Sequence, residues 1–487
     1  MTNEFKMKDK VVLILINNAF RMGRYHMALG ESLQEKGAKV IFALADRLPL
    51  YTEKLNFNSY KYYEFSTFFK ENFHNSFIPN DLVDININKL FFSDYDRNIV
   101  HGKMKFKGNY YYKSLMVNLI NFFDNIYQEN KIDYCLYESI SNSYAYAAYE
   151  VGLKRGVKYI GYQGSRLKNR FELYTEEFGS REYFKEIFKN ISFNSISEED
   201  KISIKDYLST YNSKSMPTYH PRKTRLDWNF SIVKRYLNIE KINLFIRSFK
   251  FVVKEYSLIK FSYQSGNPIN EYFKAFWIQL KKIYTTRASL KYFDKTDFNK
   301  KYFLYPQHFK PEASTSVLAR EYCSDIALIE NIAFNLPFGT ELYVKEHFVN
   351  FGRMPLSFYK KIKQIPNVRL IKCEENTKSL VDNSQGIITL TSTVGFEALL
   401  IGKPVYVLGK VFYDCHPNCR KISSFEQLSS ELRNLSINNN AEINIKFIAA
   451  YRKITYKGNI AYGIGDENYK TEYFTEPFIN AINERIC

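Results

Sequence analysis

The sequence has no apolar run long enough to cross a lipid bilayer. The run Val11–Ile16 falls far short of the roughly 20 apolar residues that a spanning helix needs. It is also too short for the apolar core of a secretory signal, and the residues before it are mainly polar, so we expect no signal peptide. These absences predict a cytoplasmic protein, with a peripheral position at the inner membrane left open.

Cysteine is scarce and scattered, because only six cysteines occur in 487 residues. A disulfide framework is therefore not expected, and reduced thiols fit the cytoplasm. The one local group, Cys415-His416-Pro417-Asn418-Cys419, offers at most three metal ligands and has no second cluster. A structural zinc site is accordingly not predicted.

Several sequence motifs are also missing. The loop after the first strand, Asn17–Arg24, lacks the G-x-G-x-x-G pattern, so a dinucleotide-binding fingerprint is absent. No fixed-period repeat and no motif of RNA or DNA recognition occurs, so nucleic acid is not an expected partner. The length of 487 residues suits two or three domains.

Residues 1–180 have the pattern of an α/β domain. The apolar run Val11–Ile16, a helical segment over 19–36 and the run Lys39–Leu44 predict a strand–helix–strand unit. A second unit follows at 132–162, with a helix over Ser143–Lys154. We expect this domain to lie on the acceptor side of a two-domain enzyme.

Residues 181–300 change in character and predict a mainly helical, basic insert or linker. Residues 221–300 contain 17 Lys and Arg but only 6 Asp and Glu. Basic amphipathic helices of this kind suit an anionic membrane leaflet, an acidic glycan or nucleic acid. An ordinary solvated helical surface explains the same pattern.

From residue 301 a second α/β domain is predicted, extending to 465, and residues 466–487 are expected to form a helix that crosses back to the first domain. Within the second α/β domain, the stretch GIITLTSTVGFEALLIGKPVYVLG (386–409) predicts two parallel strands joined by a short helix. Thr391, Ser392 and Thr393 stand where that helix begins and suit a phosphate, while Glu397 suits a ribose diol. An ordinary capped helix remains the alternative.

Two further strand ends of this domain carry polar side chains. Gln307 and His308 follow the strand Tyr302–Tyr305, where a histidine suits phosphate binding or acid catalysis. Lys345 and His347 end the strand over 342–345 and suit the charge that develops on a leaving nucleotide phosphate. Structural loops with ordinary surface charges would give the same pattern.

In the first domain, Glu138 follows the strand Ile132–Tyr137 and is our candidate general base or nucleophile. The alternative is an acid that merely stabilises a helix N-terminus. Arg166 and Arg170 follow the next strand and suit bidentate contacts with an acidic acceptor.

The runs YPQHFKPEASTS, LYVKEHF and LTSTVGFEALLIGKPVYVLGKVFYD resemble the capsule polysaccharide biosynthesis family, which includes bacterial β-Kdo transferases. The family's His-Pro pair stands here as His347-Phe348, and its Gln-Pro loop stands here as Pro306-Gln307-His308. The resemblance implies a GT-B-like fold, with two Rossmann-like doubly wound domains facing a cleft. It also implies a CMP-activated sugar as donor and no bound metal or other cofactor.

The predicted activity is therefore glycosyl transfer in capsule, lipopolysaccharide or O-antigen synthesis, from a CMP-linked donor such as Kdo to a glycan or lipid-linked acceptor. Glu138 and His308 are the expected catalytic residues. A polyol-phosphate transferase that uses CDP-glycerol is an alternative, because its acceptor is polyanionic. A sugar-nucleotide epimerase and a non-catalytic basic scaffold or nucleic-acid-binding protein are the others.

Overall fold

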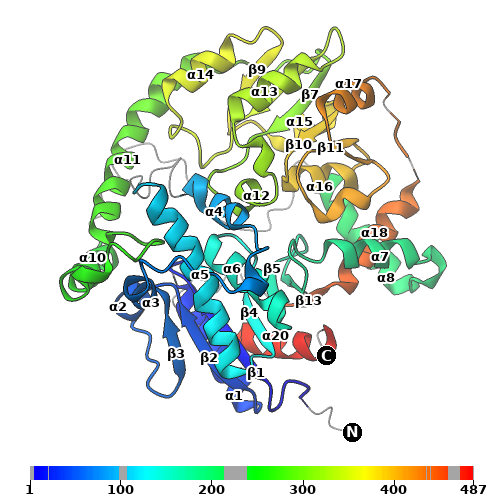
Figure 1. Ribbon diagram of the computed structural model, residues 1–487. Helices are drawn as coiled ribbons and strands as arrows, with labels where there is room; N and C mark the ends of the chain where they lie inside the picture. Colours follow the sequence, from blue (N-terminus) through cyan, green and yellow to red (C-terminus); the bar gives the residue numbers. More distant parts are fainter. Residues whose placement is uncertain are drawn as a thin grey trace. The chain divides into compact units, whose positions relative to one another are not determined.

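The computed structural model describes residues 5–19, 21–97, 107–212, 238–434, 436–438, 440–458 and 472–485. Contacts divide the chain into two domains (Figure 1). The first domain consists of residues 1–180, 234–276 and 455–487, and the second of residues 181–233 and 277–454. The segment predicted as a separate helical part, 181–300, is thus divided between the two domains.

The first domain is built around a seven-stranded sheet with the order β13-β6-β5-β4-β1-β2-β3. The strands β1 to β5 run parallel, while β6 and β13 are antiparallel to their neighbours. Its strands are β1 Val11–Ile16, β2 Lys39–Leu44, β3 Lys61–Glu64, β4 Tyr134–Glu138, β5 Lys158–Gly164, β6 Arg170–Tyr174 and β13 Thr455–Lys457. Its helices are α1 Met22–Glu35, α2 Leu48–Thr52, α3 Phe65–Glu71, α4 Ile87–Tyr95, α5 Asn109–Asn130, α6 Ser143–Arg155, α10 Ile239–Lys254, the start of α11 Pro268–Ser289, and α20 Glu472–Arg485.

The second domain contains a six-stranded parallel sheet with the order β12-β11-β10-β7-β8-β9. Its strands are β7 Tyr302–Pro306, β8 Glu341–Lys345, β9 Val368–Ile371, β10 Gly386–Thr389, β11 Val405–Val407 and β12 Cys419–Lys421. Besides the end of α11, its helices are α7 Arg181–Asn190, α8 Glu198–Ser209, α12 Ala313–Ser316, α13 Asp325–Phe334, α14 Leu356–Lys363, α15 Thr377–Asn383, α16 Thr393–Leu400, α17 Phe425–Arg433 and α18 Ala441–Lys453.

Local sequence explains these elements. The central strand β1 has the sequence VVLILI and is buried along almost its whole length, as expected for a parallel strand covered on both faces. Asn142 begins α6 by accepting a hydrogen bond from the Ala145 N–H at 3.0 Å. Gly156 ends α6 in a left-handed conformation (φ 73°), which glycine adopts without steric cost.

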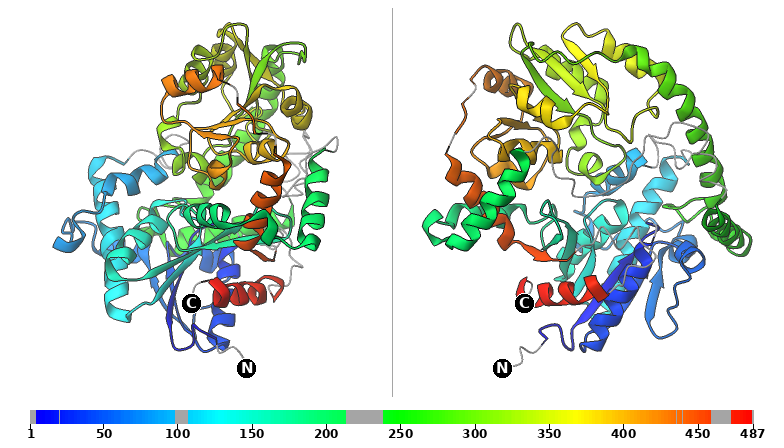
Figure 2. Two further views of the ribbon diagram at one scale, coloured as in Figure 1. Left: turned by 90° about the vertical axis from the view of Figure 1, so that its right-hand side faces the viewer. Right: turned by 180° about the vertical axis from the view of Figure 1, so that it is seen from behind.

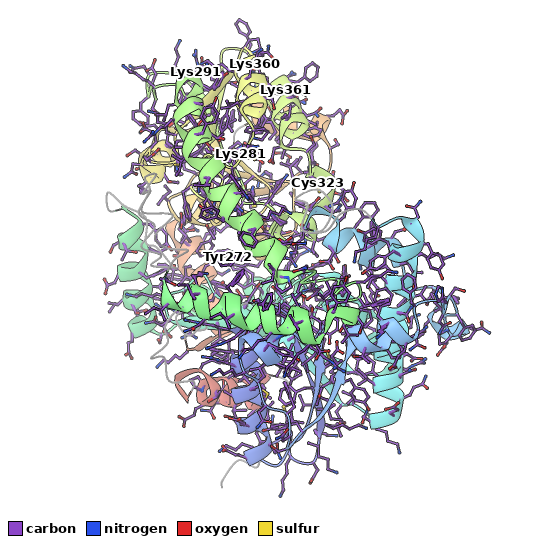
Figure 3. All side chains as sticks on the ribbon, turned by 90° about the vertical axis from the view of Figure 1, so that its left-hand side faces the viewer. Tyr272, Lys281, Lys291, Cys323, Lys360 and Lys361 are labelled. Carbon is purple, nitrogen blue, oxygen red and sulfur yellow. The ribbon has the colours of Figure 1, made fainter. Side chains whose placement is uncertain are left out.

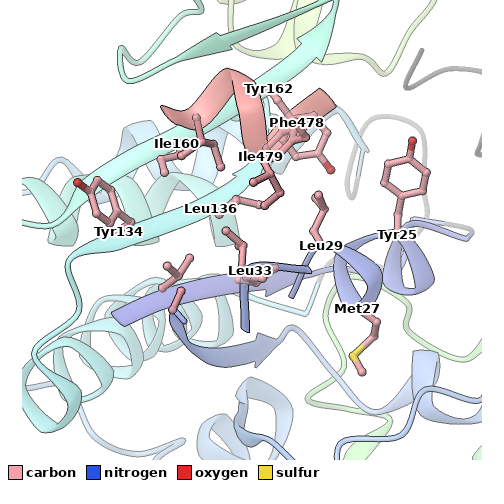
Figure 4. Packing of buried hydrophobic residues seen from close by; sticks show 14 of the residues in the cluster. Tyr25, Met27, Leu29, Leu33, Tyr134, Leu136, Ile160, Tyr162, Phe478 and Ile479 are labelled. Atoms are coloured by element: carbon pink, nitrogen blue, oxygen red, sulfur yellow. The ribbon is translucent and has the colours of Figure 1, made fainter. Parts of the chain in front are cut away.

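The helix α20 closes the core of the first domain. It contacts α1, β6 and β13, and Figure 2 shows it beside α1. Phe474, Phe478 and Ile482 are fully buried, and Figure 4 shows Phe478 and Ile479 among side chains from α1, β4 and β5. Burial of each large apolar side chain contributes roughly 1.5–3 kcal/mol. Residues 466–471 and 486–487 of the predicted final helix lie outside the described residues.

The predicted α/β class with two doubly wound domains is confirmed, since each domain has its own mainly parallel sheet with crossover helices. The predicted strands 11–16 and 39–44 coincide with β1 and β2. In the ranges that the structure describes, no helix combines the length and apolar character that a membrane crossing requires.

Candidate functional site

The chemistry predicted for the second domain lies at the switch point of its sheet. From the central strand β7 the chain proceeds to β8 and β9 on one side, and then to β10, β11 and β12 on the other. The strands β7 and β10 are neighbours at which the order reverses, with Ile387 opposite Leu304. Open α/β sheets bind ligands beyond the carboxyl ends of the strands at such a point. The residues that follow β7 and β10 therefore meet there.

His308 and Thr391 join the two strand ends directly. The Thr391 N–H donates a hydrogen bond of 3.1 Å to His308 Nε2, and both residues are buried. Because Nε2 accepts this bond, the ring proton of a neutral His308 sits on Nδ1. Burial lowers the pKa of His308 to about 3, and the charges of Lys310 and His347 add to this effect. The ring is therefore neutral at physiological pH and offers Nδ1–H as a donor.

The start of α16 is built by hydroxyl groups and close backbone approaches. The Ser392 side chain caps the helix by accepting from the Val394 N–H at 3.1 Å, and Thr393 is the first helical residue. Thr389 Oγ1 accepts from the Ser392 N–H at 3.1 Å. A Cβ at Gly409 would lie 2.6 Å from Thr391 Cγ2, so only glycine allows β11 to end this close to the turn. The turn is thus held tightly at the end of the sheet.

Gln307 lies between the ends of β7 and β8. Its N–H donates to the Lys345 carbonyl at 2.9 Å, and the side chain is buried. Gln307 Oε1 and His308 Nδ1 are buried atoms without a hydrogen-bond partner within the described chain. Unpaired buried polar atoms are costly, so these two atoms can still accept or donate a hydrogen bond with a ligand or a water molecule at the switch point.

Lys345 and His347 extend the site along β8. Lys345 Nζ donates to the Cys373 carbonyl at 2.8 Å, and burial lowers the pKa of this lysine. The His347 ring lies 4.7 Å from that of Phe348, and its Nδ1 accepts from the Val349 N–H at 3.2 Å. Both side chains come from the strand end that adjoins β7, as predicted from the sequence.

Glu397 lies one turn further along α16 and is buried. Burial is the main cause of the raised pKa values of Tyr207 and Tyr211. The hydrogen bond between them lowers the pKa of Tyr207 and raises that of Tyr211, and the charge of Glu397 adds to the rise in both. The carboxylate therefore lies near the end of α8 in the same domain. Its predicted contact with a ribose stays a prediction.

The first domain has a switch point of its own, between β1 and β4. The chain proceeds from β1 to β2 and β3 on one side and to β4, β5 and β6 on the other. Glu138 is the last residue of β4, and Asn17 directly follows β1. Burial raises the pKa of Glu138, while hydrogen bonds from Tyr137 and Asn17 and the charge of Arg97 oppose this rise. A carboxylate with a raised pKa is a stronger base.

The two predicted acceptor-binding arginines have different surroundings. Arg170 lies in β6, where its Nε donates to Thr455 Oγ1 at 2.7 Å and its Nη2 to the Thr455 carbonyl. It thus ties the edge strand β13 to the sheet. Arg166 is half-buried in the turn between β5 and β6. Their contact with an acceptor stays a prediction.

Sequence reasoning missed two buried carboxyl groups beyond the carboxyl ends of strands, one in each domain. Glu346 is only 1% exposed, and it accepts a bond of 2.7 Å from the Tyr359 hydroxyl. Burial raises its pKa to about 8. Asp46, beyond the end of β2, accepts from Asn18 and Ser265 at 2.6 Å each, and burial raises its pKa to about 6. For Glu346 the sequence offered one signal. Side chains alternate along an extended chain, so Glu346 turns away from Lys345 and His347.

Metal ligands do not converge in the described ranges, where no three His, Cys, Asp or Glu side chains gather closely enough to hold an ion. In the Cys415–Cys419 group, where no zinc site is predicted, His416 makes hydrogen bonds within the protein. Its Nε2 lies 3.0 Å from Asn444 Oδ1, and its Nδ1 accepts from the Asn418 N–H at 3.1 Å.

Residues 237–418 match the sequence model of a protein family described as "Capsule polysaccharide biosynthesis protein". The resemblance to the capsule polysaccharide biosynthesis family is confirmed. The matched segment includes β7, β8, β10 and α16, and therefore every element of the switch point in the second domain. No curated protein matches the chain.

Solved structures with some similarity include two of KpsC from Thermosulfurimonas dismutans, described as a β-Kdo 2,4 transferase and a β-Kdo 2,7 transferase. The β-Kdo 2,4 transferase has 15% identity, a TM-score of 0.37, and coverage of 69% of this chain and 84% of its own. The β-Kdo 2,7 transferase has 13% identity, a TM-score of 0.33, and coverage of 74% and 89%. A UDP-GlcNAc 2-epimerase from Neisseria meningitidis has 13% identity, a TM-score of 0.25, and coverage of 98% and 99%. With TM-scores below 0.5, these similarities carry no argument about activity or substrate.

Proposed function

We propose that the protein is a glycosyltransferase of bacterial surface polysaccharide synthesis, acting in the assembly of capsule, lipopolysaccharide or O-antigen. It transfers a sugar from a nucleotide-activated donor to a glycan or lipid-linked acceptor. The observation that carries the proposal is the contact between His308 and Thr391 at the switch point of the second domain. This contact lies inside the segment that matches the capsule family.

The donor phosphate is assigned to the first turn of α16. The dipole of a helix N-terminus favours an anion, and Ser392 and Thr393 carry hydroxyl groups there that can donate to it. Lys345 supplies a positive charge from the adjoining strand end. Such preorganised groups stabilise the charge that develops on the nucleotide phosphate when the glycosidic bond breaks.

The rest of the donor is assigned to Gln307 and His308. His308 Nδ1–H is a donor and Gln307 Oε1 an acceptor, and both lack a partner within the described chain. A base edge or a sugar hydroxyl offers the complementary pair of groups. A neutral His308 binds by donating a hydrogen bond, and it holds no second proton to give to a leaving group near neutral pH.

The resemblance to the capsule family favours a CMP-linked donor, with Kdo or another ulosonic acid as the sugar. The donor serves as a co-substrate, and the proposal includes neither a metal ion nor another cofactor. In the first domain, Glu138 is the proposed base or nucleophile, because it ends the strand at the switch point. Arg166 and Arg170 are the proposed acceptor ligands, and the basic segment 221–300 is proposed to hold the enzyme at the inner leaflet.

Thermal unfolding of the purified chain with CMP, CDP, UDP, GDP and ATP tests the proposal, because a ligand of the folded state raises the midpoint. We expect a selective rise with CMP. Ser392→Ala is expected to reduce this rise. Ser424→Ala is the matched control, since Ser424 caps α17 of the same domain by accepting from the Gln427 N–H at 3.2 Å. It removes a cap of the same kind away from the switch point.

The outcomes separate the candidate functions. A rise with CDP, followed by polyol-phosphate transfer from CDP-glycerol, would replace the glycosyltransferase by the CDP-glycerol-type enzyme. Preference for UDP or GDP would discard the CMP-linked donor. No rise with any nucleotide would contradict a donor site in the second domain and favour a basic scaffold.

A further inference from the structure

The helix α10 has two apolar faces, and only one of them packs on the protein. On the packed face, Phe251 is buried and its ring lies 5.6 Å from that of Tyr51. Arg247 reaches the Thr52 carbonyl at 3.0 Å, and Glu255 pairs with Arg47 at 3.3 Å. These contacts fix which side of α10 faces the first domain.

The opposite face of α10 is apolar and exposed. Five residues spaced three or four apart lie along it with 44–78% of their surface exposed: Ile239, Ile242, Ile246, Phe249 and Val253. We call this row the α10 stripe. The exposed Tyr256 follows just beyond the end of the helix. Phe245 extends the apolar surface towards α11, where its ring lies 5.1 Å from that of Tyr272 and 6.0 Å from that of the exposed Phe273. Figure 3 looks onto this side, with Tyr272 labelled.

The spacing of the α10 stripe makes it a continuous surface rather than scattered exposed residues. Residues three and four apart lie one above another on a helix. A surface helix normally turns its apolar face to the core and a polar face to water. A contiguous apolar row that faces water is a surface for binding.

Basic groups border the α10 stripe, while the nearby carboxylates are paired. Lys250 and Lys254 are exposed and lie on one flank of the row. Glu240 pairs with Arg21 at 2.9 Å, and Glu255 pairs with Arg47. The border therefore carries net positive charge.

A cavity of about 290 Å³ lies beside the first turns of α10, and Ile239 of the stripe belongs to its lining. Three arginines, Arg21, Arg24 and Arg247, line it together with two carboxylates, Glu53 and Glu240. The excess of guanidinium groups suits an anionic head group next to an apolar row, because arginine binds phosphate through several N–H groups.

We propose that α10 lies in the interfacial layer of an anionic lipid bilayer. The α10 stripe inserts at the boundary of the acyl chains, and Lys250 and Lys254 contact the lipid head groups, as in amphipathic helices that bind membranes in plane. A second copy of the chain is the alternative occupant of this surface, and the test below distinguishes the two. The proposal rests on the proposed function only for the purpose of membrane binding, which would bring the enzyme to a lipid-linked acceptor.

Co-sedimentation of the full-length protein with vesicles tests the proposal without nucleotide or acceptor, so its result is independent of the donor site. We expect binding to vesicles of phosphatidylcholine with 30% phosphatidylglycerol, and much weaker binding to pure phosphatidylcholine. Ile246→Asp with Phe249→Asp should reduce binding more than tenfold. Lys250→Gln with Lys254→Gln should reduce it on the order of thirtyfold, given about fivefold per basic residue at an anionic surface.

Matched controls keep the test specific to the α10 stripe. Leu153→Asp changes another exposed apolar residue of the first domain, on α6, and Lys36→Gln with Lys39→Gln removes two exposed lysines elsewhere in that domain. These variants should bind vesicles as the wild type does. All substituted side chains are exposed, so circular dichroism should show unchanged folding.

Three results would overturn the proposal. They are absence of binding to anionic vesicles at low salt, equal binding by the stripe variant and the wild type, and a wild-type dimer in ultracentrifugation that the stripe variant dissociates without any change in vesicle binding. The last result would assign the stripe to a second copy of the chain.

Discussion

The neutral state of His308 predicts how one substitution changes the response to acid. His308 is buried, accepts a hydrogen bond from the Thr391 N–H and has its pKa lowered to about 3. An unfolded histidine has a pKa near 6.5, so the unfolded chain takes up this proton first as the pH falls. His308 therefore lowers the stability of the folded chain below about pH 6.5, and the cost grows by about 1.4 kcal/mol per pH unit.

His308→Gln keeps an oxygen that can accept from the Thr391 N–H but removes the titrating group. At pH 5 the wild-type histidine costs about 2 kcal/mol, and this figure hardly changes for any folded pKa below about 4. We expect the variant to be close to the wild type at pH 7.5, and to gain about 2 kcal/mol relative to the wild type at pH 5. Other titrating groups, such as Glu346 and Asp46, are shared by both proteins and cancel in the difference.

Urea unfolding of both proteins at pH 7.5 and pH 5.0, followed by circular dichroism, measures this change. His308→Ala is the companion variant, because it removes the proton site and also leaves the buried Thr391 N–H without an acceptor. The missing bond should lower its free energy of unfolding by roughly 1–3 kcal/mol at both pH values. Its stability relative to the wild type should nevertheless improve by the same roughly 2 kcal/mol between pH 7.5 and pH 5. A difference between wild type and His308→Gln that does not depend on pH would refute the neutral, buried state of His308.

Three further predictions concern single side chains. Phe478→Ala, which empties a fully buried position between Phe171 and Tyr162, should lower the free energy of unfolding by about 3–5 kcal/mol in urea titrations. Ser392→Ala should cost about 1 kcal/mol of stability and weaken nucleotide binding about fivefold in calorimetry, and unchanged affinity would remove Ser392 from the donor site. Glu138→Gln should reduce transfer at least about a hundredfold in a product assay while nucleotide affinity stays the same, and normal turnover would contradict its catalytic role.

The sequence predicts the central strands well because parallel strands buried on both faces carry continuous apolar runs. The strands β1 and β2 have the bounds that their sequences predict, and β7 differs by one residue. The strand β3, with the sequence KYYE, lies at the edge of its sheet and lacks such a run, so the sequence does not predict it. The short strands β12 and β13 were missed for the same reason.

The candidate site is predictable where it depends on chain position and not where it depends on packing. Gln307, His308 and Thr391 follow strands of one parallel sheet, and strand ends share an edge, so their neighbourhood follows from the pattern. The bond from Tyr359 to Glu346 joins α14 to the end of β8, 13 residues apart, and no local pattern indicates it. The exposure of the α10 stripe cannot be predicted from the sequence for a related reason. An apolar row has the same spacing whether it packs on a core or faces solvent, and the sequence shows only the spacing.

The place of α20 in the core of the first domain has a consequence for synthesis on the ribosome. The strand β1 is made early, but Phe474, Phe478 and Ile482 of the same core are translated only after the whole second domain. At about 5–20 residues per second, roughly 300 residues separate β6 from α20 by on the order of 15–60 seconds. During that time the face of β4, β5 and α1 that α20 covers is open. The nascent first domain therefore exposes an apolar surface that chaperones can bind until α20 has been translated, and the second domain can fold before the first is finished.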